Sequence, residues 1–211
     1  MMLPELYIDA NATLAEGPAW DAKTQTLYWI DILERRVYAG SKPILQLDQY
    51  VGSVAPRRNG GLVIAQRGGI WTLEANMKKR KKIAALEGEP ACNRFNDGKC
   101  DPRGRFIVGT MDHREQETSG ALYSLSPAGK FKRLLKMVRI SNGLAWSPDG
   151  GTLYFADTPT RQILAFDYHL ETGRIGNTRV RTEKLLHQGG ADVFTSSNNN
   201  ILRPSRDLQV P

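Results

Sequence analysis

The sequence predicts an all-β protein built from repeated units of propeller-blade size. Three observations carry this prediction: short apolar runs are bounded by turn residues, one polar-to-apolar unit recurs along the chain, and no helical hydrophobic period extends far. Units of about 45 residues with four short strands each have the size of one propeller blade. Four such units account for nearly all of the 211 residues, which we expect to form a single domain, 1–211.

The repeat is visible as a constant spacing between a polar position and the first apolar residue of a strand. These apolar residues are Leu27, Leu62, Ile107 and Leu153, and eleven positions before them stand Glu16, Val51, Asn96 and Asn142. Equivalent positions of successive blades converge on the central channel of a propeller. The three oxygen-bearing side chains of the first, third and fourth copies are therefore expected to meet there.

Further runs between these copies have the composition of strands. They are residues 37–38, 44–45, 70–73, 106–108, 121–125, 131–135 and 162–166, and residues 126–129 are expected to form a hairpin turn. Trp20 and Trp146 fill the apolar place of the repeat and are expected in the core. His113 has no partner at metal-ligand spacing, so we expect it to be exposed.

The composition is that of an ordinary globular protein, with 40% hydrophobic and 24% charged residues. No run reaches the length of a membrane span, and residues 1–9 do not resemble a secretory signal, so a cytoplasmic location is expected without a membrane partner. The net charge is +7, and a basic run occupies 78–82. No aromatic residue interleaves this run, so we expect a solvated hairpin tip and no nucleic-acid partner, with polyanion binding as the alternative.

Several motifs then occur in order. They are EGP at 16–18, LYWID at 27–31, RFNDGK at 94–99, GTM at 109–111, GALY at 120–123, SNG at 141–143 and FDY at 166–168. On these motifs, over about 16–180, the chain resembles the SMP-30/gluconolactonase/regucalcin family of six-bladed β-propellers. Against that family, residues 181–211 form a divergent, C-terminally truncated tail. The resemblance thus implies an incomplete ring of about four blades plus a fragment.

The resemblance also implies a metal-dependent hydrolase that opens sugar lactones, with a small-molecule lactone as substrate and one divalent ion, calcium or zinc, as cofactor. By resemblance, Glu16, Asn96 and Asn142 are expected to hold the metal, while Arg94 and Asn96 meet the substrate. Carboxylate and amide oxygens are also the ligands that a hard divalent cation takes. Taken singly, Asn96 and Asn142 can equally be turn formers near glycine.

Two departures from the family concern the site. Relatives place an acidic substrate contact where this chain has Arg114, and we expect the neighbouring Glu115 to take that role. The family's aspartate that is both metal ligand and general base corresponds to Asp192, which is followed by Val193 instead of glycine. The alternatives are a lactonase impaired by truncation and a non-catalytic propeller fragment that binds calcium or a partner protein. The open edges of an incomplete ring would also favour self-association.

Overall fold

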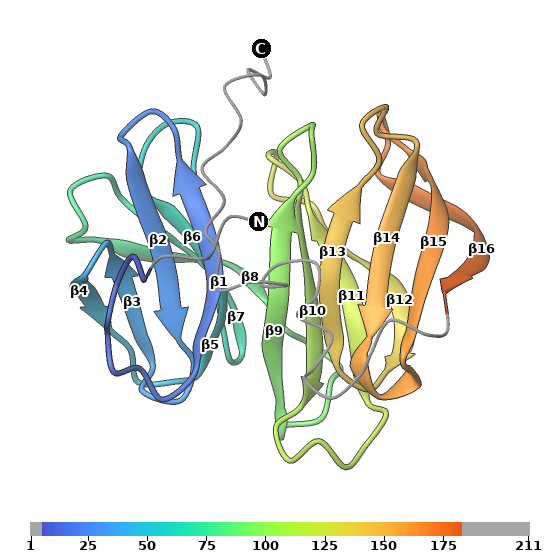
Figure 1. The fold of residues 1–211 in the computed structure, drawn as a ribbon, viewed down its shortest axis with the longest axis horizontal. Helices are drawn as coiled ribbons and strands as arrows, with labels where there is room; N and C mark the ends of the chain where they lie inside the picture. The colour runs from blue at the N-terminus through green and yellow to red at the C-terminus, as the bar shows by residue number, and fades with distance from the viewer. Residues whose placement is uncertain (1–5, 183–211) are drawn as a thin grey trace.

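The computed structural model describes residues 6–182, with side chains described for 6–180, and these residues form four antiparallel sheets (Figure 1). The first sheet contains β1 (Ala15–Asp21), β2 (Thr26–Asp31), β3 (Arg36–Ala39) and β4 (Lys42–Gln46). The second contains β5 (Val51–Pro56), β6 (Leu62–Gln66), β7 (Gly69–Leu73) and β8 (Arg80–Ala85).

The third sheet contains β9 (Asn93–Cys100), β10 (Phe106–Asp112), β11 (Gly120–Leu125) and β12 (Phe131–Val138). The fourth contains β13 (Ser141–Trp146), β14 (Thr152–Asp157), β15 (Gln162–His169) and β16 (Arg174–Thr182), with one 3₁₀ turn, η1 (Thr158–Thr160), between β14 and β15. Within each sheet the strands are paired in chain order. The expected all-β fold is confirmed, and the expected fragment after the fourth unit lies outside the described residues.

The four copies of the repeat correspond to the four sheets. The apolar residue of each copy lies in the second strand of its sheet and is buried: Leu27, Leu62, Ile107 and Leu153. The residue eleven positions earlier lies in the first strand. The spacing is constant because it spans the same hairpin each time, from one strand through a tight turn into its antiparallel partner.

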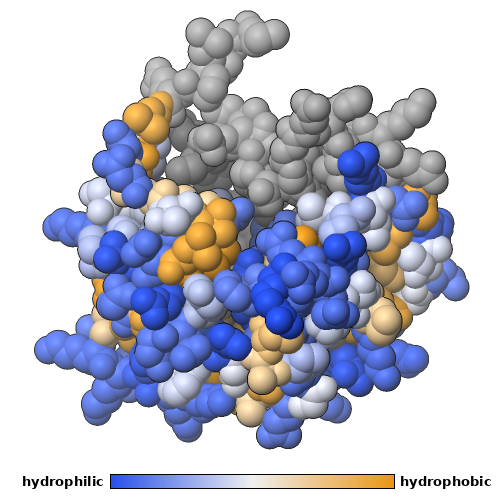
Figure 2. All heavy atoms as spheres, turned by 90° about the horizontal axis from the view of Figure 1, so that it is seen from below, coloured by the Kyte–Doolittle hydropathy of each residue, from blue (hydrophilic) through white to orange (hydrophobic). Residues whose placement is uncertain are grey.

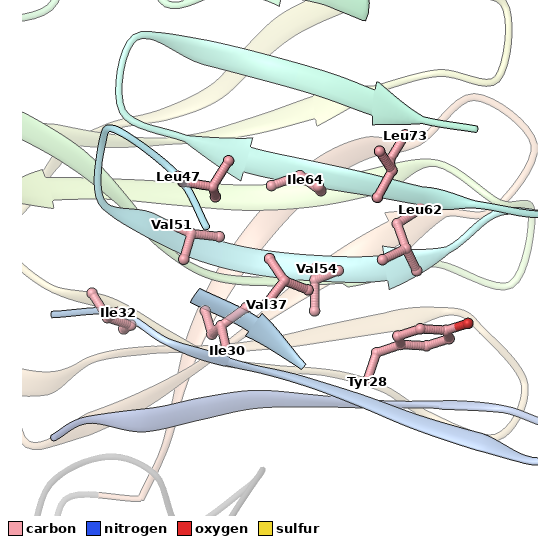
Figure 3. Packing of buried hydrophobic residues seen from close by; sticks show 10 residues of the cluster. All are labelled: Tyr28, Ile30, Ile32, Val37, Leu47, Val51, Val54, Leu62, Ile64 and Leu73. Atoms are coloured by element: carbon pink, nitrogen blue, oxygen red, sulfur yellow. The ribbon is translucent and has the colours of Figure 1, made fainter. Parts of the chain in front are cut away.

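Hydrophobic side chains fill the spaces between consecutive sheets. Figure 3 shows the cluster between the first two sheets, where Ile30 and Val37 face Val54, Ile64 and their neighbours. Equivalent clusters join the second sheet to the third and the third to the fourth. Each large aliphatic side chain buried in this way stabilises the fold by roughly 1.5–3 kcal/mol relative to exposure. The other face of the first sheet is covered by Ile8, Ala10 and Ala12.

The first strands of successive sheets lie next to one another, β1 beside β5, β5 beside β9 and β9 beside β13. The outer strands β4 and β16 lie at opposite margins of Figure 1. At Gly52 β5 comes so close to β9 that a Cβ atom would lie 2.1 Å from the backbone oxygen of Phe95. Ser53 also donates a 2.9 Å hydrogen bond to the carbonyl of Gly98. These contacts hold the second and third sheets at a fixed separation.

Two expectations about side chains are wrong. Trp20 is 37% exposed because it sits at the far end of β1 beside a cavity, whereas Trp146 packs half-buried against the cluster between the third and fourth sheets. Of the basic run, only Lys78 and Lys79 belong to the turn, and Arg80 to Lys82 begin β8.

Within residues 6–182, no helix has the length and apolar character needed to cross a membrane.

Candidate metal and substrate site

Bulges in the first strands set the direction of the predicted ligands. In β1 the pairing register shifts between Glu16 and Ala19, and in β13 it shifts between Asn142 and Ala145. Glycines with left-handed backbone follow at both places, Gly17 with φ of 56° and Gly143 with φ of 62°. In β9 the shift falls between Phe95 and Gly98 and so includes Asn96. A bulge turns a side chain away from the regular alternation of a strand. The two glycines adopt the left-handed backbone that the bulges need, and the bulges in turn set the direction of the predicted ligands.

Asn96 and Asn142 are brought into contact across the third and fourth sheets. The Nδ2 of Asn96 donates to Oδ1 of Asn142 at 3.3 Å and to the backbone oxygen of Ser141 at 2.9 Å. The amide of Asn142 in turn donates to the hydroxyl of Thr158 at 3.1 Å. Both side chains therefore have a defined orientation at the end of the sheets where the first strands begin.

Arg94 lies beside this pair and is only 5% exposed. Its Nη1 donates to Oδ1 of Asn96 at 2.8 Å and to the backbone oxygen of Phe95 at 3.0 Å, but its buried Nε has no hydrogen-bond partner among the described residues. Among the described residues, no carboxylate forms an ion pair with this guanidinium within 4.0 Å. Burial accordingly lowers the pKa of Arg94, and the nearby charges of Glu115 and Glu16 oppose that shift.

Glu16 is half-buried, and its Oε2 accepts a hydrogen bond from the backbone N–H of Gly17 at 3.2 Å. It is close enough to influence the pKa of Arg94, but no hydrogen bond joins it to Asn96 or Asn142 within the described residues. Within residues 6–182, no three His, Cys, Asp or Glu side chains gather as a metal cluster. Asp192, the predicted fourth ligand, lies outside the described residues.

Asp112 fixes the loop that carries Glu115. Its buried carboxylate accepts hydrogen bonds from the backbone N–H groups of Arg114, Gln116 and Glu117 at 3.1–3.2 Å. Burial raises the pKa of Asp112, but these hydrogen bonds outweigh it and lower the pKa to about 2. Glu115 itself has a left-handed backbone, with φ of 60°, and its carbonyl accepts a hydrogen bond from Arg139. The loop is therefore held in one conformation next to Arg94.

Two residues at this end were not predicted. Tyr50, which precedes β5, stacks on His113, with ring centroids 4.4 Å apart and an interplanar angle of 24°. His113 is thus half-buried and not exposed as expected, and its Nδ1 has no partner among the described residues. Burial lowers the pKa of His113, as do the positive charges of Arg94 and Arg67. The stack joins two different sheets, and no local pattern in the sequence signals it.

Figure 2 views the molecule from the end where β1, β9 and β13 begin. The surface seen there is mainly hydrophilic, with small hydrophobic groups between the polar side chains. At this end Arg94 contacts Asn96, Asn96 contacts Asn142, and the carboxylates of Glu16 and Glu115 are near enough to affect the pKa of Arg94. Such an arrangement suits a small polar ligand held by several hydrogen bonds.

A family described as the SMP-30/gluconolactonase/LRE-like region matches residues 14–199. The chain belongs to this family. The matched range continues beyond residue 180 and includes Asp192. Regucalcin from Gallus gallus is 38% identical to this chain over 176 residues, which is 79% of this chain and 59% of that protein. The 6-deoxy-6-sulfogluconolactonase of Pseudomonas putida is 33% identical over 216 residues, covering 94% of this chain and 74% of that enzyme.

Among solved structures, the fold is similar to a calcium-binding protein, regucalcin, from Agrobacterium tumefaciens. The TM-score is 0.78 at 28% identity, and the similarity covers 85% of this chain and 62% of that protein. The chain thus spans about three fifths of the length of the regucalcins that it matches. Family and fold therefore agree with the resemblance on which the site residues were chosen.

Proposed function

We propose that this protein hydrolyses sugar lactones at the site around Arg94. The family and the lactonases among its relatives support the reaction class. The observation that carries the proposal is the buried guanidinium of Arg94, which has no ion pair among the described residues and an unpartnered Nε. A buried cation in that state is unfavourable unless a ligand offers electron-rich oxygen atoms to it.

The available donors fit a hard divalent cation. Glu16 supplies a carboxylate, and Asn96 and Asn142 supply amide oxygens, each with a second lone pair beyond its present hydrogen bond. An all-oxygen set favours calcium over zinc, which prefers nitrogen and sulfur ligands. In this place such a cation would polarise a lactone carbonyl and lower the pKa of a bound water. Asp192 remains the proposed fourth ligand and general base.

The remaining groups have complementary tasks toward the lactone. Arg94 donates hydrogen bonds to ring or carbonyl oxygens, and Glu115, on the loop fixed by Asp112, accepts them from hydroxyl groups. The Tyr50–His113 stack offers a flat wall against which one face of a sugar ring can lie. Because His113 has a lowered pKa, it contributes this wall as a neutral ring near pH 7.

A lactonase assay with added metals tests the proposal. Glucono-1,5-lactone hydrolysis is followed with a pH indicator after chelator treatment and readdition of calcium or zinc, with the buffer background subtracted. We expect cation-dependent turnover in the wild type and at least a tenfold loss in Asn96→Ala. Asn177→Ala, at an exposed asparagine far from the site, is the matched control. Turnover that ignores the chelator, or that survives Asn96→Ala unchanged, contradicts the proposal.

Asp192 is tested in the same assay. If Asp192→Ala abolishes a robust turnover, the tail supplies the base to the site. If turnover is robust and unaffected by that change, the base is another carboxylate, with Asp97 and Glu115 the first to examine. A chain that binds calcium but shows no turnover with any metal would support the alternative of a non-catalytic cation-binding fragment.

A further inference from the structure

One blade of this protein has a large excess of basic over acidic residues. Residues 57–82 contain eight of the 29 Lys and Arg residues but only one of the 22 Asp and Glu residues, so the rest of the chain carries 21 of each sign. This segment of the second sheet alone has a net charge of +7, equal to that of the whole chain. Such an asymmetry is a signal for a polyanionic partner, whereas an evenly spread excess would mainly affect solubility.

The fold gathers five of these side chains at one end of the second sheet. The turn between β5 and β6 and the turn between β7 and β8 lie side by side. A Cβ atom added to Gly60 in the first turn would lie 3.0 Å from the Cβ atom of Ala75 in the second. The first turn carries two arginines, and the second leads into the basic start of β8. We call this group the basic end of the second sheet: Arg57, Arg58, Lys78, Lys79 and Lys81, all exposed, with Glu74 as the one acidic residue of these two turns.

Arg80 and Lys82 extend from β8 away from the basic end: Arg80 donates a 3.1 Å hydrogen bond to Oε1 of Gln66, and Lys82 lies beside Gly69. The guanidinium carbon of Arg80 lies 5.2 Å and the Nζ of Lys82 5.9 Å from the centre of the Trp71 ring. Residues two apart in a strand project from the same face about 6.7 Å from each other. β8 is also the outer strand of its sheet, so among the described residues no further strand covers these side chains.

We propose that the basic end of the second sheet binds the phosphate backbone of nucleic acid without reading its sequence. An anionic membrane is less well suited, because none of the exposed large hydrophobic residues in the described chain lies in 57–82 and Met77 packs inward on the first core cluster. A stable protein interface would need a buried apolar or aromatic anchor, and Trp71 is already covered by its own cations. Phosphate contacts need only exposed Lys and Arg.

This surface is separate from the lactone site. The turns of the basic end join the strands at the end opposite to the one where β1 and β9 begin, whereas Arg67 lies at the other end near His113. The inference therefore does not depend on lactone hydrolysis. It replaces the expectation that the basic run is merely a solvated hairpin tip.

Fluorescence anisotropy with a labelled DNA duplex of about 20 base pairs tests the inference, because counterion release makes phosphate binding fall steeply with salt. With three to five phosphates contacted, the slope of log K against log salt should lie between about −3 and −5. Two charge reversals are compared, Lys78→Glu/Lys79→Glu in the basic end and Lys130→Glu/Lys136→Glu on the third sheet. Each lowers the net charge by the same four units from +7.

We expect the first double variant to lose at least tenfold in affinity and the second less than threefold, with unchanged thermal unfolding in both. Equal losses would show that net charge alone attracts DNA and would overturn the inference, as would absent wild-type binding at about 0.15 M salt. Polyglutamate and phosphatidylserine vesicles are added as competitors at equal charge. Competition by either as strong as that of unlabelled DNA would mean that the partner is an acidic protein or a membrane, and the assignment to nucleic acid would be wrong.

Discussion

Asn96 and Asn142 are 46 residues apart in the chain, and the amide nitrogen of Asn96 lies 3.3 Å from the Oδ1 atom of Asn142. Each asparagine has its own second anchor, the backbone of Ser141 for Asn96 and the hydroxyl of Thr158 for Asn142. The pair is consequently oriented without any ligand, and a bound cation would meet oxygen atoms already in place. Preorganised donors of this kind make ligand substitution a sensitive test of the site.

Changing Asn142 should alter calcium affinity in opposite directions with two substitutions. Asn142→Asp adds a charged oxygen ligand at the same length and should tighten binding, since calcium affinity rises with ligand charge. Asn142→Ala removes the oxygen and should weaken binding about tenfold or more. Titration calorimetry with calcium measures both. Similar affinities for the wild type and both variants would show that Asn142 is no ligand.

Arg94→Met should separate stability from function. Removing a buried guanidinium that has no ion pair among the described residues relieves a desolvation penalty, so the free energy of unfolding should stay level or rise by about 1 kcal/mol. Lactone turnover should fall at least tenfold, equivalent to about 1.4 kcal/mol of barrier. Urea denaturation and the lactonase assay give the two values, with the exposed Arg58→Met as control. A clear loss of stability would instead assign Arg94 a purely structural role.

Asp112→Asn should change how the free energy of unfolding depends on pH below about pH 4. The pKa of Asp112 is lowered from 3.8 to about 2 in the folded protein, so its contribution is complete above about pH 4 and is lost as the pH falls toward 2. The asparagine variant should be less stable at pH 6, and the difference should shrink between pH 4 and pH 2. Urea midpoints across this range measure it, and the exposed Asp9→Asn is the control. A pH-independent difference would contradict the assignment.

The buried network of Asp101, Arg105 and Tyr168 should stabilise the contact between the third and fourth sheets. Asp101 lies 2.6 Å from Nε of Arg105 and accepts a 2.5 Å hydrogen bond from Tyr168. Asp101→Asn leaves the arginine without its charge partner and should destabilise by about 3 kcal/mol. Tyr168→Phe removes one hydrogen bond and should cost about 1 kcal/mol. Equilibrium urea denaturation of both variants and their double mutant checks whether the two effects are coupled.

The strands were predictable from the sequence because the hairpin linking the first two strands of each sheet has a constant length. That spacing also indicated that Asn96 and Asn142 share one place, since each precedes its apolar partner by eleven residues. Glu16 obeys the same spacing, although no hydrogen bond to either amide accompanies it in the described chain. Its role at the site rests on the family and on its electrostatic effect on Arg94.

Contacts between sheets were beyond the reach of sequence patterns. The Tyr50–His113 stack depends on how two loops of different sheets face each other, and neither residue has a distinctive neighbourhood. Trp20 was wrongly assigned to the core because a large aromatic residue at a strand position usually packs inward. The basic run lies between two apolar runs, which suggests a turn, but three of its residues are in an outer strand, where basic side chains remain solvated and discourage edge pairing.

Gly52 shows how little freedom the inner strands leave to natural variation. Every single-base change of a glycine codon that encodes a different amino acid adds a Cβ atom, and at Gly52 that atom would lie 2.1 Å from a carbonyl oxygen of β9. At Gly176, by contrast, the nearest atom would lie at 3.5 Å, an ordinary contact. One codon in a blade that supplies none of the proposed ligands therefore controls the spacing of the neighbouring strand that holds Asn96. In saturation mutagenesis, we expect no substitution at Gly52 to give a folded protein, whereas small residues should be tolerated at Gly176.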